Sequence, residues 1–385
     1  MPPQRPSTGH AALDRRIGEL LAACGSLPHP DLIRRMLVSV ILMAHDEKRA
    51  DLKIIASSLE ELERSFNILE KYHESRKVAL FGSARTGPDN PIYIQARDFA
   101  RRMEQLGYMV ITGAGGGVMQ AGNEGAGRAR SFGMNISLPF EQLANPFIAG
   151  DEKLLNFRYF FTRKLSFLKD THAVVLCPGG YGTHDEGFET LTLVQTGKAQ
   201  LLPVIFLHPA GSGFWDDLHR YVKRHLLGSG LISPEDLSLY MITEDIEAAC
   251  GEIERFYRCY HSMRLAGPDL VIRLECPLTD EHLACLQEEY SDIVNGGRIE
   301  RSGPLPEEEA DPRLSRLPRI KFPFRRHRYG RLRQMIDRIN GFVEVPEIAP
   351  TAPERGEGGR MPAEADPGRR GGSPPAPPTP EAQWR

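Results

Sequence analysis

Three glycine-rich loops contain the residues best suited to do chemistry. Their sequences are FGSAR (81–85), TGAGGGVMQ (112–120) and PGGYGTHDE (178–186). Each loop follows a short apolar run and precedes an amphipathic stretch, as a turn between a strand and a helix does. Glycine lacks a Cβ, so the backbone can turn sharply and its amides can approach a phosphate. Together the loops predict a phosphate site, although one such loop alone is equally typical of a tight turn.

The expected binding residues come from all three loops. The third loop directly precedes a helix, whose exposed first amides and dipole favour an anion. The first loop adds backbone amides and a serine hydroxyl. The residues expected to bind substrate are Gly82, Ser83, Gly115, Gly116, Gly117, Pro178, Gly179, Gly180, Gly182 and Thr183.

Carboxylates crowd the helix that follows the third loop. Asp185, Glu186 and Glu189 lie within five residues, and like charges about 6 Å apart repel by about 3 kcal/mol at an effective dielectric of about 20. The helical stretch 157–169 offers compensation through Arg163 and Lys164, with Lys164 in the middle of an apolar stripe. A single lysine there would be interpreted as snorkelling to the surface. Because Arg163 and Lys164 are adjacent cations near three carboxylates, we instead expect both side chains to point into a pocket.

Other interpretations compete for these loops. Thr183 and Glu186 have the TxxE spacing of a capping box, in which both side chains only satisfy backbone amides, and spacing alone favours that role. Val118 stands where a GxGxxG fingerprint would need its third glycine, and no GxxxxGK[ST] motif occurs. A dinucleotide oxidoreductase and a P-loop ATPase are therefore both disfavoured.

Strands alternating with helices must position the loops. The expected strands are 78–81, 109–112, 134–137, 173–177, 203–207 and 239–242, with helices at 92–106, 118–131, 157–169, 185–196, 214–227 and 245–260. This alternation predicts an α/β fold with a doubly wound parallel sheet covered on both faces. Ligands bind at the carboxyl ends of the strands in such sheets.

Additional segments flank this core. The expected organisation is a helical segment at 11–75, the α/β domain at 76–262, a small α/β module at 267–345 and a tail at 346–385. The tail holds ten of the thirty prolines and almost nothing apolar, which predicts disorder.

Composition excludes several classes of protein. Lys and Arg number 48 against 51 Asp and Glu, giving a net charge of −3, which argues against a nucleic-acid coat or a polybasic membrane binder. Six cysteines without a CxxC pair signal neither a disulfide framework nor a zinc site, and no metal or cofactor is expected. With no apolar run of membrane-spanning length, a cytoplasmic protein is expected.

The motif PGGYGTHDE, with Arg163–Lys164 and TGAGGGVM before it, resembles the LOG (Lonely Guy) family over residues 77–258. These are cytokinin riboside 5′-monophosphate phosphoribohydrolases, many once labelled lysine decarboxylases. The resemblance implies a Rossmann-like fold, a homodimer or higher homo-oligomer, and hydrolysis of nucleoside 5′-monophosphates to free base and ribose 5-phosphate. It also implies that Arg163 and Glu186 are the essential residues.

The residues agree with that chemistry. Breaking a ribosyl C–N bond builds positive charge on the sugar, which a carboxylate such as Glu186 would stabilise while orienting or deprotonating water. Arg163 would neutralise the phosphate or hold the carboxylate, and Lys164 would assist. Asp185 and Glu189 are the alternative acids.

The flanking segments and His184 depart from minimal family members. The cytokinin substrate of the family is therefore not assumed for this chain. Turnover of purine nucleotides, as in an AMP nucleosidase, fits the residues equally. Three alternatives remain. One is a non-catalytic nucleotide or molybdenum-cofactor carrier, which the pairing of Arg163 with Glu186 disfavours. The others are a pyridoxal-phosphate decarboxylase, for which no lysine has a recognisable context, and a DNA-processing protein.

A basic stretch lies outside the resemblance. Its nine cations are Arg313, Arg316, Arg319, Lys321, Arg325, Arg326, Arg328, Arg331 and Arg333. Such a cluster of cations could bind RNA or a phosphorylated effector. The favoured interpretation is neutralisation by nearby acids such as Glu307, Glu308, Glu309 and Asp311.

Overall fold

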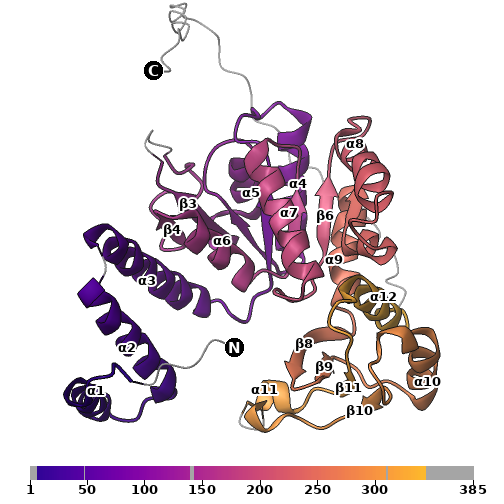
Figure 1. The fold of residues 1–385 in the computed structure, drawn as a ribbon. Coiled ribbons are helices and arrows are strands. Elements are labelled where there is room, and N and C mark those ends of the chain that lie inside the picture. Colours follow the sequence, from indigo (N-terminus) through magenta and orange to yellow (C-terminus); the bar gives the residue numbers. More distant parts are fainter. Residues whose placement is uncertain (1–6, 47, 139–142, 309–310, 344–385) are drawn as a thin grey trace, which may run out of the picture. The chain divides into compact units, whose positions relative to one another are not determined.

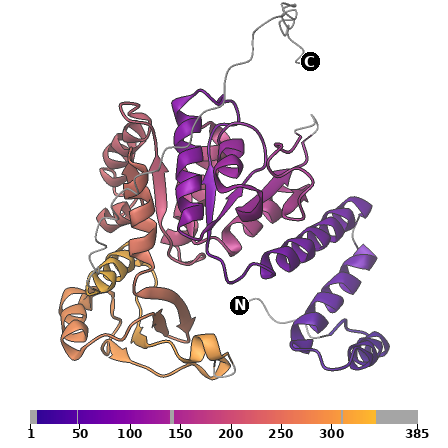
Figure 2. The same ribbon diagram turned by 180° about the vertical axis from the view of Figure 1, so that it is seen from behind.

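A seven-stranded parallel sheet carries the three glycine-rich loops (Figures 1 and 2). The computed structural model describes residues 7–46, 48–138, 143–308 and 311–343. The strands are β1 (Lys77–Phe81), β2 (Met109–Thr112), β3 (Ser131–Ile136), β4 (Leu154–Phe157), β5 (Ala173–Leu176), β6 (Val204–Leu207) and β7 (Met241–Thr243). Their order in the sheet is β4-β3-β2-β1-β5-β6-β7. The direction of winding reverses between β1 and β5, and ligands bind beyond the carboxyl ends of strands at such a switch point.

Helices cover both faces of this sheet. Helices α4 (Pro91–Gln105), α5 (Val118–Ala126) and α9 (Ile246–Phe256) pack on one face, and α3 (Arg49–Glu70), α6 (Phe160–Lys169), α7 (Tyr181–Gln195) and α8 (Phe214–Tyr221) contribute to the other. Strand β1 serves both layers, because Val78 and Leu80 join the first core while Ala79 and Phe81 join the second. All five residues of β1 are buried, as expected of a central parallel strand.

Three helices precede the sheet: α1 (Ala11–Ala23), α2 (Pro30–Asp46) and α3. The last of them is tied to α6 by polar contacts. The Glu61 carboxylate accepts hydrogen bonds from the Thr162 hydroxyl at 2.6 Å and from the Arg158 amide at 2.8 Å. Helix α3 thereby helps to place the helix that carries Arg163 and Lys164.

A four-stranded antiparallel sheet follows α9. Its strands, in the order β10-β11-β9-β8, are β10 (Glu300–Arg301), β11 (Arg319–Pro323), β9 (Asp269–Leu274) and β8 (Tyr260–Ala266), accompanied by α10 (Asp280–Glu289), α11 (Pro312–Ser315) and α12 (Tyr329–Asn340). The Asn340 side chain accepts hydrogen bonds from the Cys259 and Tyr260 amides and donates one to the Phe256 carbonyl. Helix α12 therefore fixes the chain where α9 ends and β8 begins.

Most of the basic stretch is paired with carboxylates. Six of its cations lie within ion-pair distance of an acid: Arg313, Arg319, Lys321, Arg328, Arg331 and Arg333. Two of the acids predicted to neutralise it, Glu308 and Asp311, do so, while Glu309 lies outside the described residues. Intramolecular pairing thus accounts for two thirds of this charge.

The predicted fold class is confirmed, but one strand was missed and several helix bounds differ from those predicted. Strand β4 was missed because it is a four-residue segment at the edge of the sheet. The helix expected to reach Tyr260 ends at Phe256, because Tyr257 and Tyr260 are drawn into the aromatic core and Asn340 caps the turn. The tail predicted to be disordered lies outside the described residues. Among those described, no helix is long and apolar enough to cross a membrane.

Candidate active site

A cleft of about 960 Å³ lies at the carboxyl edge of the parallel sheet, at the switch point between β1 and β5. Its walls come from the loops after β1, β2, β3 and β5 and from the first turns of α6 and α7. Seven of the predicted site residues line it: Gly82, Ser83, Arg163, Gly180, Gly182, Thr183 and Glu186. The topology therefore gathers residues that are about 100 positions apart in the chain.

Backbone hydrogen bonds lock the three loops together. The Ser83 amide donates to the Pro178 carbonyl at 3.1 Å, and the Ser83 carbonyl accepts from the Val118 amide at 2.9 Å. Gly117 has a φ of +63°, and a Cβ there would lie 2.1 Å from the Ser83 carbonyl oxygen. No other residue fits at that contact. The Ser83 amide is thus engaged within the protein, contrary to the expectation that it is offered to a ligand.

The start of α7 is open to the cleft. Gly180 is the N-cap residue and makes no side-chain cap, and the helix begins at Tyr181. Thr183 and Glu186 therefore lie inside the helix, so the capping-box alternative was wrong. The first amides of a helix lack partners within it, and the two residues that begin this helix, Tyr181 and Gly182, line the cleft at the positive end of the helix dipole. This arrangement is suited to an anion.

Gly179 makes the tight approach of this loop possible. A Cβ at this position would lie 2.1 Å from the Thr183 hydroxyl oxygen and 2.9 Å from the Ser83 amide nitrogen. Substitution would force apart the first and third loops, whose contact closes the floor of the cleft. Gly179 thus has a positioning role and does not itself line the cleft.

Glu186 is a buried carboxyl with a perturbed proton affinity. It lines the cleft but is only 6% exposed. Burial raises its pKa to about 7, although Lys164 and Arg163 nearby act to lower it. A group with this pKa changes protonation near neutral pH, where a catalytic acid or base is most useful.

Lys164 balances the acids on α7. Its ammonium lies 2.8 Å from Asp185, 2.5 Å from Glu189 and 3.8 Å from Glu186. Burial acts to lower the Lys164 pKa, but hydrogen bonds to Asp185 and Glu189 raise it above its usual value. The predicted compensation of the three carboxylates is therefore present. A lysine held charged in this way is a poor candidate for a Schiff base.

Arg163 is buried at the base of the cleft. Its Nε donates to the Met134 carbonyl at 2.8 Å, and its guanidinium lies 5.2 Å from the centre of the Phe167 ring. A Cβ at Gly113 would lie 2.6 Å from its Nη2, so a side chain there would displace the Arg163 guanidinium. Arg163 and Glu186 are close enough to influence each other's pKa values but form no ion pair in the described part of the chain. Both groups thus keep polar capacity for a ligand.

The remaining predicted residues do not line the cleft. These are Gly115, Gly116, Gly117, Lys164, Pro178 and Gly179. Gly117, Pro178 and Gly179 hold the loops against each other, and Lys164 lines a neighbouring groove beside Glu189. For Gly115 and Gly116 the predicted contact with substrate stays a prediction.

Sequence reasoning missed a cation at the mouth of the cleft. Arg85 lines the cleft, is exposed, and forms no ion pair with any described carboxylate. Its position in the FGSAR loop was the available signal. The aromatic rings of Phe160 and Tyr181, 52% and 98% exposed, also line the cleft and were not singled out.

One group of residues has the donor types of a metal site. His208, Asp216 and Glu244 place ligand atoms within 4.8 Å of one another beyond the ends of β6 and β7. Glu244 already accepts a hydrogen bond from the Gly211 amide at 2.9 Å, and Asp216 is exposed. None of the three lines the cleft.

Residues 116–253 match the family model described as "Possible lysine decarboxylase". The matched segment is a LOG-like domain. The resemblance noted in the sequence is thereby confirmed, and the matched segment includes Arg163, Lys164 and the whole of the PGGYGTHDE loop. No curated protein matches the chain.

Several solved structures are similar to the LOG-like domain. The X-ray structure of TM1055 is 23% identical and covers 47% of this chain and 99% of its own, with a TM-score of 0.34. The molybdenum cofactor binding protein of Rippkaea orientalis is 18% identical, with coverages of 46% and 94% and a TM-score of 0.32. DNA processing protein A of Helicobacter pylori is 16% identical, with coverages of 46% and 80% and a TM-score of 0.30. Similarities at this level carry no argument about function.

Proposed function

We propose that the LOG-like domain hydrolyses the N-glycosidic bond of nucleoside 5′-monophosphates to free base and ribose 5-phosphate. The observation that carries the proposal is Glu186, a buried carboxyl with a pKa of about 7 in the same cleft as an open helix N-terminus. An α-helix rises about 1.5 Å per residue, so Glu186 lies about 7 Å along α7 from its first amides. A phosphate at those amides would place the sugar beside this carboxyl.

The reaction needs stabilisation of a cationic sugar. As the C1′–N bond breaks, positive charge develops on the ribose ring, and the Glu186 carboxylate stabilises it. The same carboxylate orients water and accepts its proton as the oxygen bonds to C1′. That proton finally resides on the departing base, so the products are neutral base and ribose 5-phosphate.

Cations hold the substrate and the acid in place. Arg85 at the mouth of the cleft and the first amides of α7 bind the phosphate. Arginine is suited to this role because its guanidinium can bind an oxyanion with two parallel hydrogen bonds. Arg163 lies behind Glu186 and favours its ionised form. Lys164 neutralises Asp185 and Glu189, so that their charge does not repel the phosphate.

A homo-oligomer is part of this proposal. Phe160, Phe161 and Leu165 on α6 are each at least half exposed, and Tyr181 at the start of α7 is almost fully exposed. A group of large apolar side chains on adjacent helices is typical of an interface between subunits. Because Phe160 and Tyr181 also line the cleft, a second copy covering them would help to close it.

A substrate panel tests the activity. We would incubate the full chain with AMP, GMP, CMP, UMP, N6-substituted AMP and the matching nucleosides, and measure free base by liquid chromatography. We expect base from at least one monophosphate and none from its nucleoside, because the phosphate provides the anchoring charge. Tight binding of a monophosphate without release of base would favour a non-catalytic carrier and overturn the proposal.

A further inference from the structure

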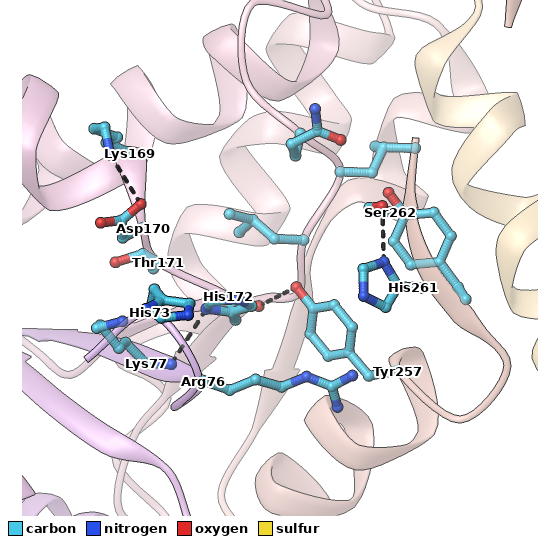
Figure 3. A pocket seen from close by; sticks show the side chains of 14 residues that line it. His73, Arg76, Lys77, Lys169, Asp170, Thr171, His172, Tyr257, His261 and Ser262 are labelled. Atoms are coloured by element: carbon cyan, nitrogen blue, oxygen red, sulfur yellow. Dashed lines mark hydrogen bonds and ion pairs between the residues drawn. The ribbon is translucent and has the colours of Figure 1, made fainter. Parts of the chain in front are cut away.

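A buried histidine without a hydrogen bond to its ring stands at the carboxyl edge of the parallel sheet. His208 directly follows β6 and is 1% exposed, and its Nδ1 is buried without a partner in the described part of the chain. Two partly buried histidines elsewhere do have partners. Nδ1 of His172 accepts from the Lys77 amide at 3.2 Å, and Nδ1 of His261 lies 2.8 Å from the Ser262 hydroxyl (Figure 3). Because buried polar groups are normally satisfied, His208 is suited to bind a ligand.

Two carboxylates stand beside this histidine. Its Nε2 lies 3.8 Å from Oδ2 of Asp216, which is too long for a hydrogen bond. Ligand atoms of His208, Asp216 and Glu244 all lie within 4.8 Å of one another. Within the described residues neither carboxylate forms an ion pair with a lysine or arginine, whereas the adjacent Asp217 pairs with Arg220. The imidazole thus adjoins two negative charges that no described lysine or arginine neutralises.

The fold holds His208 and Glu244 side by side. Strands β6 and β7 pair in parallel with Leu207 opposite Thr243, so His208 and Glu244 are the next residues on the two strands. The buried side chain of Gln95 on α4 donates to both of their carbonyl oxygens, at 3.0 Å to His208 and at 2.8 Å to Glu244. The backbone at both positions is therefore fixed in advance, which reduces the entropic cost of binding a ligand.

The third residue comes from α8. Asp216 lies in the first turn of this helix, next to Trp215, which is fully buried and donates from its indole nitrogen to the Leu207 carbonyl at 3.3 Å. Trp215 thereby anchors the start of α8 on the end of β6. The Asp216 side chain is 51% exposed, so it can move toward His208 without disturbing the core.

We propose that His208, Asp216 and Glu244 bind a divalent transition-metal ion of the Zn²⁺ type. One imidazole with two carboxylates is a donor set that suits Zn²⁺, whereas Mg²⁺ and Ca²⁺ prefer oxygen ligands alone. Two atoms bonded to one Zn²⁺ at about 2.1 Å in a tetrahedral arrangement lie about 3.4 Å apart, so the exposed carboxylates need to move by about 1 Å. Water completes the coordination.

The ion would fasten the turn between β6 and α8 to the end of β7. None of its three ligands lines the candidate active site, so we expect it to stabilise the fold and to take no part in the proposed hydrolysis. Its connection to the cleft is indirect. The Trp215 ring packs against the ring of His184, with centroids 5.3 Å apart, and His184 lines the cleft. The metal site therefore does not depend on the proposed activity.

Calorimetric titration of the chelator-treated full chain with Zn²⁺ tests the proposal. Wild type should contain one site that Asp216→Asn and Glu244→Gln each weaken at least about 100-fold, because one of three protein ligands is lost. Glu244→Gln keeps an acceptor for the Gly211 amide. Asp217→Asn is the matched control, since Asp217 is the exposed neighbour outside the group, and should leave the affinity unchanged. Zinc bound by the free cysteines is common to all four chains and cancels in the comparison.

Two further measurements locate the ion. Trp384→Phe leaves Trp215 as the single tryptophan. In this background Co²⁺, a paramagnetic substitute for Zn²⁺, should quench the fluorescence, and adding Asp216→Asn should abolish the quenching. Saturating Zn²⁺ should raise the melting temperature of wild type and of Asp217→Asn, but not of Asp216→Asn, because only a bound ion stabilises the folded chain.

The outcomes are distinct. Weakening confined to Asp216→Asn and Glu244→Gln, without binding of Mg²⁺ in the same concentration range, supports the site. Equal Zn²⁺ affinity in wild type and these two variants, or equal weakening by Asp217→Asn, would show adventitious binding only and would overturn the proposal. Mg²⁺ binding as tight as that of Zn²⁺ would also overturn it, because the imidazole would then not be a ligand.

Discussion

Two buried glutamates have opposite proton affinities in this molecule. Glu186 in the cleft is 6% exposed and Glu308 beside the antiparallel sheet is 2% exposed. Burial raises the pKa of Glu186 to about 7. Burial also acts to raise the pKa of Glu308, but hydrogen bonds from Arg273 and Arg319 lower it to about 2. Burial alone therefore does not decide the charge of a carboxyl.

The difference lies in how completely each carboxylate is paired. Glu308 is bound by two buried guanidinium groups, with Arg273 Nε at 3.0 Å and Arg319 Nη2 at 2.8 Å. Glu186 has Lys164 at 3.8 Å, and that ammonium is closer to Asp185 and Glu189. A fully paired carboxylate stabilises the fold, whereas a partly paired one is available to a substrate.

The largest expected effect comes from neutralising Glu186. Glu186→Gln should lower kcat for base release at least about 1,000-fold, because the amide neither stabilises the sugar cation nor accepts a proton. Steady-state chromatography of the released base measures it. Asp185→Asn is the matched control, since Asp185 is exposed, and should cost less than about tenfold. Equal losses in both variants would point to general repulsion on α7 and not to a specific role of Glu186.

Neutralising Glu308 should damage stability instead. Glu308→Gln leaves two buried guanidinium groups underpaired and should lower the free energy of unfolding by about 3 kcal/mol. Urea denaturation measures this. Glu300→Gln removes an exposed pair with Lys321 and should cost less than about 1 kcal/mol. Similar losses of unfolding free energy in the two variants would contradict the claim that Glu308 stabilises the fold through its buried ion pairs.

Glu186→Gln should also stabilise the protein at high pH. Since the folded-state pKa is raised, the wild type loses stability as pH rises from about 4.5 through about 7. The variant lacks this loss, so at pH 8 it should be about 3 kcal/mol more stable, with no advantage below about pH 4.5. Thermal melts at the two pH values test this, and an advantage independent of pH would assign it to another cause.

Arg85 should affect substrate binding more than chemistry. Arg85→Ala should raise KM for a nucleoside monophosphate about tenfold and leave kcat nearly unchanged, because one ionic contact with the phosphate is lost. Initial rates over a range of substrate concentrations separate the two constants. An unchanged KM would remove Arg85 from the phosphate site.

The pH profile should show the smallest change. For wild type, kcat/KM should rise as pH passes about 7, because the carboxylate is the active form of Glu186. Lys164 lowers the pKa of Glu186, so Lys164→Met should move this rise to higher pH. A profile that falls across the same range would make Glu186 a proton donor.

Much of the site could be predicted because glycine and charge leave local signals. The alternation of strands and helices predicted a parallel sheet, and PGGYGTHDE with Arg163 indicated the cleft before its geometry was known. The start of α7 could not be predicted, because TxxE spacing fits both a cap and an open helix. Nor could the pairing of Ser83 with Pro178, or the hydrogen bonds to Asn340, since both depend on contacts between residues far apart in the chain.

The most direct test is a single-turnover experiment with the protein in excess over AMP at pH 8, or over whichever monophosphate the panel shows to be preferred. Wild type should convert the nucleotide into equal amounts of base and ribose 5-phosphate, while Glu186→Gln should hold it bound and intact. Release of base by Glu186→Gln at the wild-type rate would contradict the account.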